Sequence, residues 1–361
     1  MTPLLTIQSS RRHYTVEEYA AFSEALASVS GEGTLVLIDQ FILDKYGDVL
    51  RAAAPHLKCL PLEASEEQKS FEKLAPVFVW LLENGLKRDG RLLVIGGGVM
   101  QDIGCFVASV LFRGIRWELI PTTLLAQCDS CIGSKSSINI QSYKNQIGTF
   151  YPPDRVLLVT DFLRTLPWDE VRSGMGEVIK LHLLAGEDKL RWLSERLDRG
   201  CTDMAVLPEC IRSSLLIKQP FIEKDEHDTG IRNLLNYGHT FGHAYESATH
   251  YAIPHGIAVT VGVLTATFIS GQMGFVTADD FQALRKALAP WYQPYEEKLK
   301  SLPIETILAA IKLDKKNTRA GLHCILTRGP GRMEKVRLPA ELDLGRLVSD
   351  AIEAMQGSSK P

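Results

Sequence analysis

The sequence lacks the features that mark membrane, secreted and nucleic-acid-binding proteins. No apolar run approaches the ~20 residues that span a bilayer. Residues 1–8 have no basic region ahead of an apolar core, so no signal peptide is expected. Lysine and arginine (40) do not outnumber aspartate and glutamate (43), and the net charge of −3 gives no broad basic field. Any anion-binding site must therefore come from a local cluster of side chains.

Cysteine is also scarce. Seven cysteines in 361 residues, an odd number, do not form a disulfide framework, and a reducing cytoplasm is the simplest compartment. Cys128 and Cys131 have the spacing of a redox motif or of half a zinc site, but the sequence has no second pair of this kind. The favoured interpretation is two ordinary buried thiols.

The first part of the chain alternates short apolar segments with helical patterns. Strands are expected at 34–39, 57–62, 91–95, 117–120 and 156–159, and helices at 66–85 and from Val99. This alternation predicts a mainly parallel sheet with helices on its faces. From residue 166 the pattern is almost purely helical, with periodicity at 171–184, 188–197, 205–222, 258–273, 278–288 and 303–313. We therefore expect an α/β nucleotide-binding domain over 1–165 and an α-helical domain over 166–361.

A glycine turn follows the expected strand at 91–95. Gly97 and Gly98 lie where the backbone can approach a pyrophosphate at a helix N-terminus. The spacing is not G-x-G-x-x-G, so a turn that merely requires glycine is an equal alternative. Asp39 ends the first strand and suits either a ribose hydroxyl or a helix N-cap. Glu66 and Lys69 likewise suit a ligand or a solvated helix start.

A polar segment at 129–150, expected to be a loop, follows Thr122 and Thr123. Its candidate binding residues are Asp129, Lys135, Asn139, Lys144 and Asn145. Two lysines and two asparagines beside a glycine turn suit a phosphorylated ligand, whereas taken alone the segment reads as a polar surface loop. Arg113, taken alone, is interpreted as a partner of a helix C-terminus.

The densest group of imidazoles lies further along the chain. His239 and His243 are four residues apart, so on a helix they share one face, and His255 follows. With Glu177 upstream, one glutamate and two histidines would leave the open coordination position of a catalytic zinc site. The pair lacks the glutamate of the H-E-x-x-H motif, so His239 need not share the metal with His243.

Several polar residues around this group would be left for the substrate. Lys180 is three residues after Glu177, and Arg232 and Asn236 precede the first histidine. Lys218 and Lys315 add positive charge whose placement the sequence leaves open. Lys315 with its neighbour reads equally well as solvated surface charge.

Together these motifs resemble the 3-dehydroquinate synthase family and the wider sugar phosphate cyclases. The resemblance covers about residues 39–316 and rests on the joint occurrence, in this order, of segment 96–102, segment 121–129, Lys135, and segments 144–145, 176–180, 236–243 and 255–256. It implies an NAD-binding N-terminal domain and a helical, metal-binding C-terminal domain, with the active site and NAD in the cleft between them.

The resemblance also implies roles for individual residues. The zinc ligands would be Glu177, His239 and His255. The NAD contacts would be Asp39, Glu66, Lys69, Gly97, Gly98, Asp102, Thr122, Thr123 and Phe162. The substrate contacts would be Asp129, Lys135, Lys144, Asn145, Lys180, Lys218, Arg232, Asn236, His243 and Lys315. Arg113 would reach the substrate phosphate of a neighbouring subunit, which implies a homodimer.

The implied activity is a carbon–oxygen lyase reaction of the shikimate pathway, which leads to the aromatic amino acids. DAHP, a phosphorylated seven-carbon keto acid, would lose phosphate and cyclise to 3-dehydroquinate. NAD would act as a recycled hydride carrier, and zinc, with cobalt as the alternative, would polarise the carbinol oxygen. Arg232 favours an acid substrate, because a guanidinium pairs bidentately with a carboxylate.

Some positions depart from the family pattern. The family usually has Gly-Gly-Lys-Thr-Gly around Lys135, and here serine occupies positions 134, 136 and 137 of that motif. Asp228 replaces a glutamate, and Ile257 replaces a glutamate close to His255. Gln101 stands where glycine is common. These changes indicate a divergent member. They keep open a sister cyclase of the cyclitol or amino-DAHP type in a specialised pathway. A non-catalytic ligand-binding relative and a metal-dependent polyol dehydrogenase are further alternatives.

Overall fold

The structure, a computed structural model, describes residues 2–141, 143–197, 204–313, 322–339 and 341–356. The chain divides into two compact units, Met1–Leu166 with Leu207–His227, and Pro167–Val206 with Asp228–Pro361. The first break between the units, after Leu166, lies next to the predicted domain boundary between residues 165 and 166. The segment Leu207–His227, which the sequence pattern assigned to the helical domain, belongs to unit 1, because its helix α7 (Leu207–Lys224) packs against β1 and the turn at Ala126–Ser130.

Unit 1 is built on a seven-stranded sheet in the order β1-β2-β9-β6-β5-β3-β4. The strands are β1 Leu5–Ile7, β2 Tyr14–Tyr19, β3 Thr34–Asp39, β4 Lys58–Leu62, β5 Arg91–Gly96, β6 Arg116–Pro121 and β9 Arg155–Val159. Only β1 pairs antiparallel with its neighbour, and the other pairs run parallel. The mainly parallel sheet is confirmed, and all five predicted strands are present.

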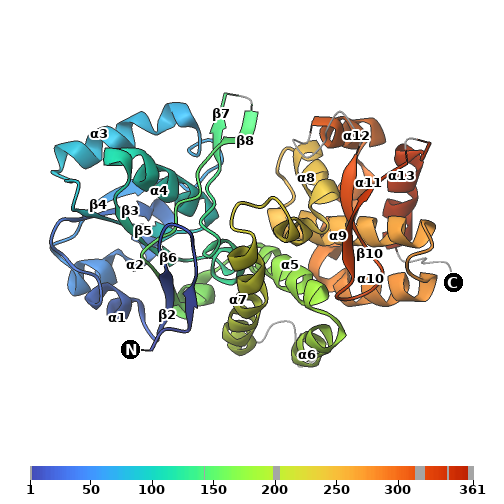
Figure 1. The fold of residues 1–361 in the computed structure, drawn as a ribbon, viewed down its shortest axis with the longest axis horizontal. Helices are drawn as coiled ribbons and strands as arrows, with labels where there is room; N and C mark the ends of the chain where they lie inside the picture. The colour runs from blue at the N-terminus through green and yellow to red at the C-terminus, as the bar shows by residue number, and fades with distance from the viewer. Residues whose placement is uncertain (1, 142, 198–203, 314–321, 340, 357–361) are drawn as a thin grey trace. The chain divides into compact units, whose positions relative to one another are not determined.

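Helices cover both faces of this sheet (Figure 1). On one face, α1 (Phe22–Ala27) and α2 (Gln40–Ala53) enclose a core that includes Val36, Ile38 and Ile95. On the other face, α4 (Gly98–Val110) packs against β3, β5 and β6. Because the central strands are buried on both sides, they consist almost entirely of apolar residues.

Two sequence-based expectations for unit 1 were wrong. Residues 66–85 do not form one helix. Residues 66–69 are a turn, which is followed by η1 (Phe71–Lys73) and α3 (Ala75–Glu83). Helix α3 carries Pro76 in its first turn, where proline is well tolerated. Residues 129–150 are not a simple loop, since they contain a hairpin of β7 (Ile138–Ile140) and β8 (Tyr143–Ile147). The polar composition concealed these strands, because a two-stranded ribbon has little buried surface to fill.

Unit 2 is helical, as predicted. Its helices are α5 Trp168–Ala185, α6 Glu187–Leu197, α8 His239–Ala248, α9 His255–Gln272, α10 Ala278–Tyr292, α11 Glu296–Lys300, α12 Ile304–Leu313 and α13 Leu344–Met355. Helix α9 is buried on all sides and packs against α5, α8, α10 and α13 (Figure 1). An unpredicted hairpin, β10 (His323–Thr327) with β11 (Met333–Arg337), also packs on it. Among the described helices, none has both the length and the apolar character that crossing a membrane requires.

Candidate active site

Two glycines bring α5 and α9 into backbone contact. A Cβ atom at Gly176 would lie 2.0 Å from the carbonyl oxygen of Gly256, and one at Gly256 would lie 1.7 Å from the carbonyl oxygen of Ser173. The backbone N–H of Gly256 also donates to the Ser173 hydroxyl at 3.0 Å. This crossing places Glu177, which follows one glycine, next to His255, which precedes the other.

Alanine at Gly256 is therefore expected to destabilise unit 2 by roughly 3 kcal/mol, because the added methyl forces the two helices apart. Chemical denaturation of Gly256→Ala measures this loss. Gly271→Ala is the matched control on the same helix, because the nearest atoms lie 3.8 Å from a Cβ there. Equal unfolding free energies for the two variants would contradict the close crossing.

A carboxylate and three imidazoles meet beside this crossing. The Nε2 atoms of His239 and His255 lie 3.5 and 3.3 Å from the same oxygen of Glu177, Oε1. One candidate ligand atom from each of His239, His243 and His255 lies within 4.8 Å of the others. Glu177 and Lys180 are buried and form an ion pair within α5. The structure therefore brings the three predicted ligands together and adds His243 to the group.

The other ring nitrogens of two of these histidines face hydrogen-bond acceptors. Nδ1 of His239 lies 3.3 Å from the carbonyl oxygen of Tyr237, and Nδ1 of His255 lies 3.1 Å from Oε2 of Glu246. Burial opposes the charged form of His255, but Glu246 and Glu177 raise its pKa to about 10. Because Nδ1 of each ring faces an acceptor, Nε2 is the nitrogen that would bind a metal, which would displace any proton that Nε2 carries.

The predicted carboxylate-binding residues lie directly before α8. Arg232 is buried and Asn236 is half-buried in η6 (Ile231–Asn236), which contacts α5. Asp228, with φ of +58°, lies three residues before η6, and its backbone carbonyl and Oδ1 each accept a hydrogen bond from the Asn233 side chain. Unit 2 thus combines a guanidinium, an ammonium and the carboxylate–imidazole group. Lys315 lies outside the described residues.

In unit 1, the glycine turn joins the end of β5 to the start of α4. Gly97 is the N-cap of α4, and a Cβ there would lie 2.9 Å from Cγ2 of Thr123. The backbone N–H of Thr122 donates to the carbonyl oxygen of Gly96 at 3.1 Å. Gln101, the departure from the family pattern, exchanges two hydrogen bonds with Ser130. The turn and both threonines therefore lie together at the carboxyl ends of β5 and β6, the edge where open α/β sheets bind ligands.

A buried charge network adjoins this turn. The Nζ atom of Lys69 lies 3.1 Å from Asp102, from Glu66 and from Asn145. Burial would lower the pKa of Lys69, but Asp102 and Glu66 raise it above its usual value. Glu66 also accepts a hydrogen bond from Asn139 at 3.0 Å. These residues fix the β7–β8 hairpin to the start of α4, so the solvated-helix interpretation of Glu66 and Lys69 was wrong.

The remaining phosphate-binding candidates of unit 1 are spread over this region. The Nζ atom of Lys218, on α7, lies 2.7 Å from a carboxylate oxygen of Asp129. Lys135 is exposed, and Lys144 lies in β8. Arg113 is exposed at the end of η2 (Leu111–Arg113) with a φ of +66°, a strained conformation for a non-glycine residue.

Two predicted NAD contacts also have structural roles. Oδ1 of Asp39 accepts the backbone N–H of Phe41 at 3.0 Å, so the N-cap interpretation of Asp39 is confirmed. Burial raises the pKa of this carboxyl. Phe162 is buried, and its ring centroid lies 5.0 Å from that of Phe22 and 4.9 Å from that of Tyr46. A contact of this ring with NAD would require the core to open, so only the backbone of Phe162 suits that role.

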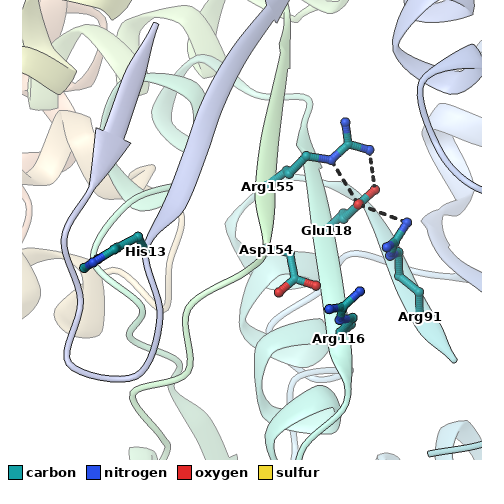
Figure 2. Close-up of a pocket in the computed structure, with 6 residues that line it drawn as sticks. All are labelled: His13, Arg91, Arg116, Glu118, Asp154 and Arg155. Atoms are coloured by element: carbon teal, nitrogen blue, oxygen red, sulfur yellow. Dashed lines mark hydrogen bonds and ion pairs between the residues drawn. The ribbon is translucent and has the colours of Figure 1, made fainter. Parts of the chain in front are cut away.

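A cavity of about 260 Å³ lies elsewhere in unit 1 (Figure 2). Its lining consists of His13, Arg91, Arg116, Glu118, Asp154 and Arg155. Arg91, Arg116 and Arg155 begin β5, β6 and β9, so the cavity is at the amino ends of the strands, opposite the glycine turn. Glu118 pairs with Arg91 at 3.3 Å and with Arg155 at 3.0 Å. These six residues are not among the predicted site residues, and we interpret them as a charge cluster that stabilises the sheet edge.

The described residues fit a divalent metal and a dinucleotide. A carboxylate with two imidazole Nε2 atoms is the donor set of a catalytic zinc site. The side-chain-free turn at Gly97 and the N-terminus of α4 suit a pyrophosphate. Cys128 and Cys131 are buried free thiols, as expected.

The fold is that of the sugar phosphate cyclases. A crystal structure of 2-deoxy-scyllo-inosose synthase, complexed with carbaglucose-6-phosphate, NAD⁺ and Co²⁺, superposes with a TM-score of 0.85 and 24% identity and covers 96% of this chain and 98% of its own. ValA, a 2-epi-5-epi-valiolone synthase from Streptomyces hygroscopicus with NAD⁺ and Zn²⁺ bound, gives 0.81 and 23%, with coverage of 96% and 98%.

Sequence comparison assigns the chain more closely. The models of the N-terminal and C-terminal parts of 3-dehydroquinate synthase match residues 59–173 and 174–317. The 3-dehydroquinate synthase of Dictyoglomus thermophilum is 36% identical over 317 residues, which is 86% of this chain and 87% of that protein. The chain belongs to the 3-dehydroquinate synthase family, and the predicted family and enzyme class are confirmed.

Glu246 was not among the residues predicted from the sequence. It lies three residues after His243 and seven after His239, so all three side chains share one face of α8. This spacing was visible in the sequence. Its meaning was not, because nothing local indicates that this face meets His255.

Proposed function

We propose that this protein cyclises DAHP to 3-dehydroquinate with elimination of phosphate, using NAD and a divalent cation. The observation that carries the proposal is the convergence of His239 Nε2 and His255 Nε2 on one oxygen of Glu177. The 36% identity to proteins named 3-dehydroquinate synthase supports the substrate. Homology of this kind also supports a role in aromatic amino acid biosynthesis in the cytoplasm.

The proposed cofactors follow from the donor sets and from the neighbours. The two cyclase structures contain NAD⁺ with Co²⁺ or Zn²⁺. When bound, NAD⁺ supplies a reversible hydride acceptor, and zinc supplies a Lewis acid for the carbinol oxygen. Glu177, His239 and His255 would hold the metal, with His243 left for the substrate. Gly97, Gly98, Thr122, Thr123 and Asp39 would line the dinucleotide.

The other groups of unit 2 suit the acid part of the substrate. Arg232 would bind the carboxylate through two parallel hydrogen bonds, because a guanidinium matches the two oxygens in one plane. Its burial makes this pairing stronger than it would be in water. Asn236 and Lys180 would orient hydroxyl groups.

The cationic groups of unit 1 suit the phosphate. Lys135, Lys144 and Asn145 offer donors for its oxygens, and Lys218 holds Asp129 in place at 2.7 Å. Lys69 keeps Asn145 fixed at 3.1 Å. Arg113 would contribute to the same phosphate from a neighbouring subunit, so the proposed assembly is a homodimer. Backbone strain of this kind is often retained at functional positions, which fits a binding role for Arg113.

A panel of substrates tests the proposed function. Purified protein with NAD⁺ and Zn²⁺ is incubated with DAHP, a neutral seven-carbon sugar phosphate or a hexose phosphate, and phosphate release is followed. We expect release from DAHP. No release from DAHP above the background of an Arg232→Ala variant would refute the proposal.

The second candidate is a sister cyclase of the cyclitol or amino-DAHP type. The observation that favours it is the Gln101–Ser130 pair, which adds a side chain close to the glycine turn where the family usually has glycine. In the same panel, activity toward another sugar phosphate but not toward DAHP would select this candidate.

A further inference from the structure

Glu246 has no role in the proposed reaction, yet it faces the metal site. Its Oε2 atom lies 3.1 Å from Nδ1 of His255, and its side chain is only 13% exposed. On the opposite side of the same ring, Nε2 lies 3.3 Å from Glu177. The His255 imidazole is thus held between two carboxylates, one from α8 and one from α5.

The other candidate ligand is held differently. Nδ1 of His239 faces the carbonyl oxygen of Tyr237, a backbone group of its own segment. His255 is the first residue of α9, and the acceptor at its Nδ1 atom, Glu246, belongs to another helix. The side chain of Ile257, two residues on, is fully buried in α9 and has no atom that accepts a hydrogen bond. The acceptor for His255 therefore comes from α8.

We propose that Glu246 is a positioning residue for the metal: it accepts a hydrogen bond from Nδ1–H of His255 and thereby holds Nε2 of that ring toward the metal position beside Glu177. This inference rests on the proposed function only in assuming a divalent cation at Glu177, His239 and His255. A carboxylate acceptor fixes both the tautomer and the orientation of a ligating imidazole and makes its nitrogen a stronger donor.

The test measures metal affinity rather than turnover. Apo-protein is titrated with Zn²⁺ against a competing chelator, and with Co²⁺ while the visible absorption spectrum is recorded, for Glu246→Ala and Glu246→Gln. Glu297→Gln is the control, because Glu297 is an exposed carboxylate of unit 2 that pairs with Lys300. Circular dichroism checks that each variant is folded, and if the alanine variant is not, the glutamine variant decides.

We expect Glu246→Ala to raise the Kd for Zn²⁺ by ~10–100-fold and to alter the Co²⁺ spectrum. Glu246→Gln should raise the Kd less, because the amide oxygen still accepts a hydrogen bond from Nδ1–H of His255. The control should match the wild type. An unchanged Kd, or tighter binding, would overturn the inference, since it would mean that the contact is only an ion pair of the metal-free protein. Because the readout needs no substrate, it is independent of the phosphate-release panel.

Discussion

Glutamine at Glu177 is expected to reduce phosphate release on the order of 10³-fold, because the site loses its anionic ligand and with it the Lewis acid. Removal of metal from the wild type with a chelator should have a similar effect. Added Zn²⁺ should restore the wild type but not Glu177→Gln. Initial rates of phosphate release with DAHP, before and after metal is added back, provide the measurement.

A second effect of the same substitution must be separated from the first. Glu177 pairs with Lys180, and both side chains are buried, so the glutamine variant leaves a buried ammonium without its counter-charge. We therefore expect a loss of stability, which thermal unfolding detects. Glu170→Gln is the matched control, because Glu170 lies on the same helix and is exposed. Restoration of Glu177→Gln by Zn²⁺ would contradict the assigned ligand.

Alanine at Arg232 is expected to lower kcat/KM for DAHP by on the order of 10²–10³-fold, because the substrate carboxylate loses a desolvated, charge-assisted pair worth ~2–5 kcal/mol. Arg232→Lys should recover only part of this loss, since an ammonium keeps the charge but not the paired geometry. Steady-state kinetics on the three proteins measures both effects.

The substrate provides the control for Arg232. An analogue of DAHP without the carboxylate should be processed equally by the wild type and by Arg232→Ala, since neither makes the contact. Guanidinium ion added to the alanine variant should restore part of its activity with DAHP. An equal loss with both substrates would show that Arg232 supports the fold of η6 rather than the acid group.

The fold was predictable where burial dictates composition. Strands β3, β5 and β9 contain unbroken apolar runs, and the apolar run of β6 is interrupted only by Glu118, because helices cover both faces of the sheet. Strand β2 was missed because it contains Glu17 and Glu18, which pair with Arg155 at 3.3 Å and with Arg212 at 2.7 Å. Charges that are neutralised by distant segments give no strand signal in a local pattern.

The site was predictable in its residue types but not in its geometry. Spacing on a helix indicated that His239 and His243 share a face, and the resemblance supplied the ligand set. The crossing at Gly176 and Gly256 joins segments about 80 residues apart, and periodicity contains no information about such a contact. The ion pairs of Lys69 and the hydrogen bond from His255 to Glu246 were hidden for the same reason.

The central claim is that the divalent cation and the dinucleotide serve one cyclisation in which NAD is regenerated. The most direct measurement is phosphate release from excess DAHP by the zinc-loaded protein at a limiting concentration of NAD⁺. The account predicts many phosphates released per NAD⁺, with no accumulation of NADH. Accumulation of NADH in step with substrate consumption, or release of no more phosphate than the NAD⁺ supplied, would contradict it.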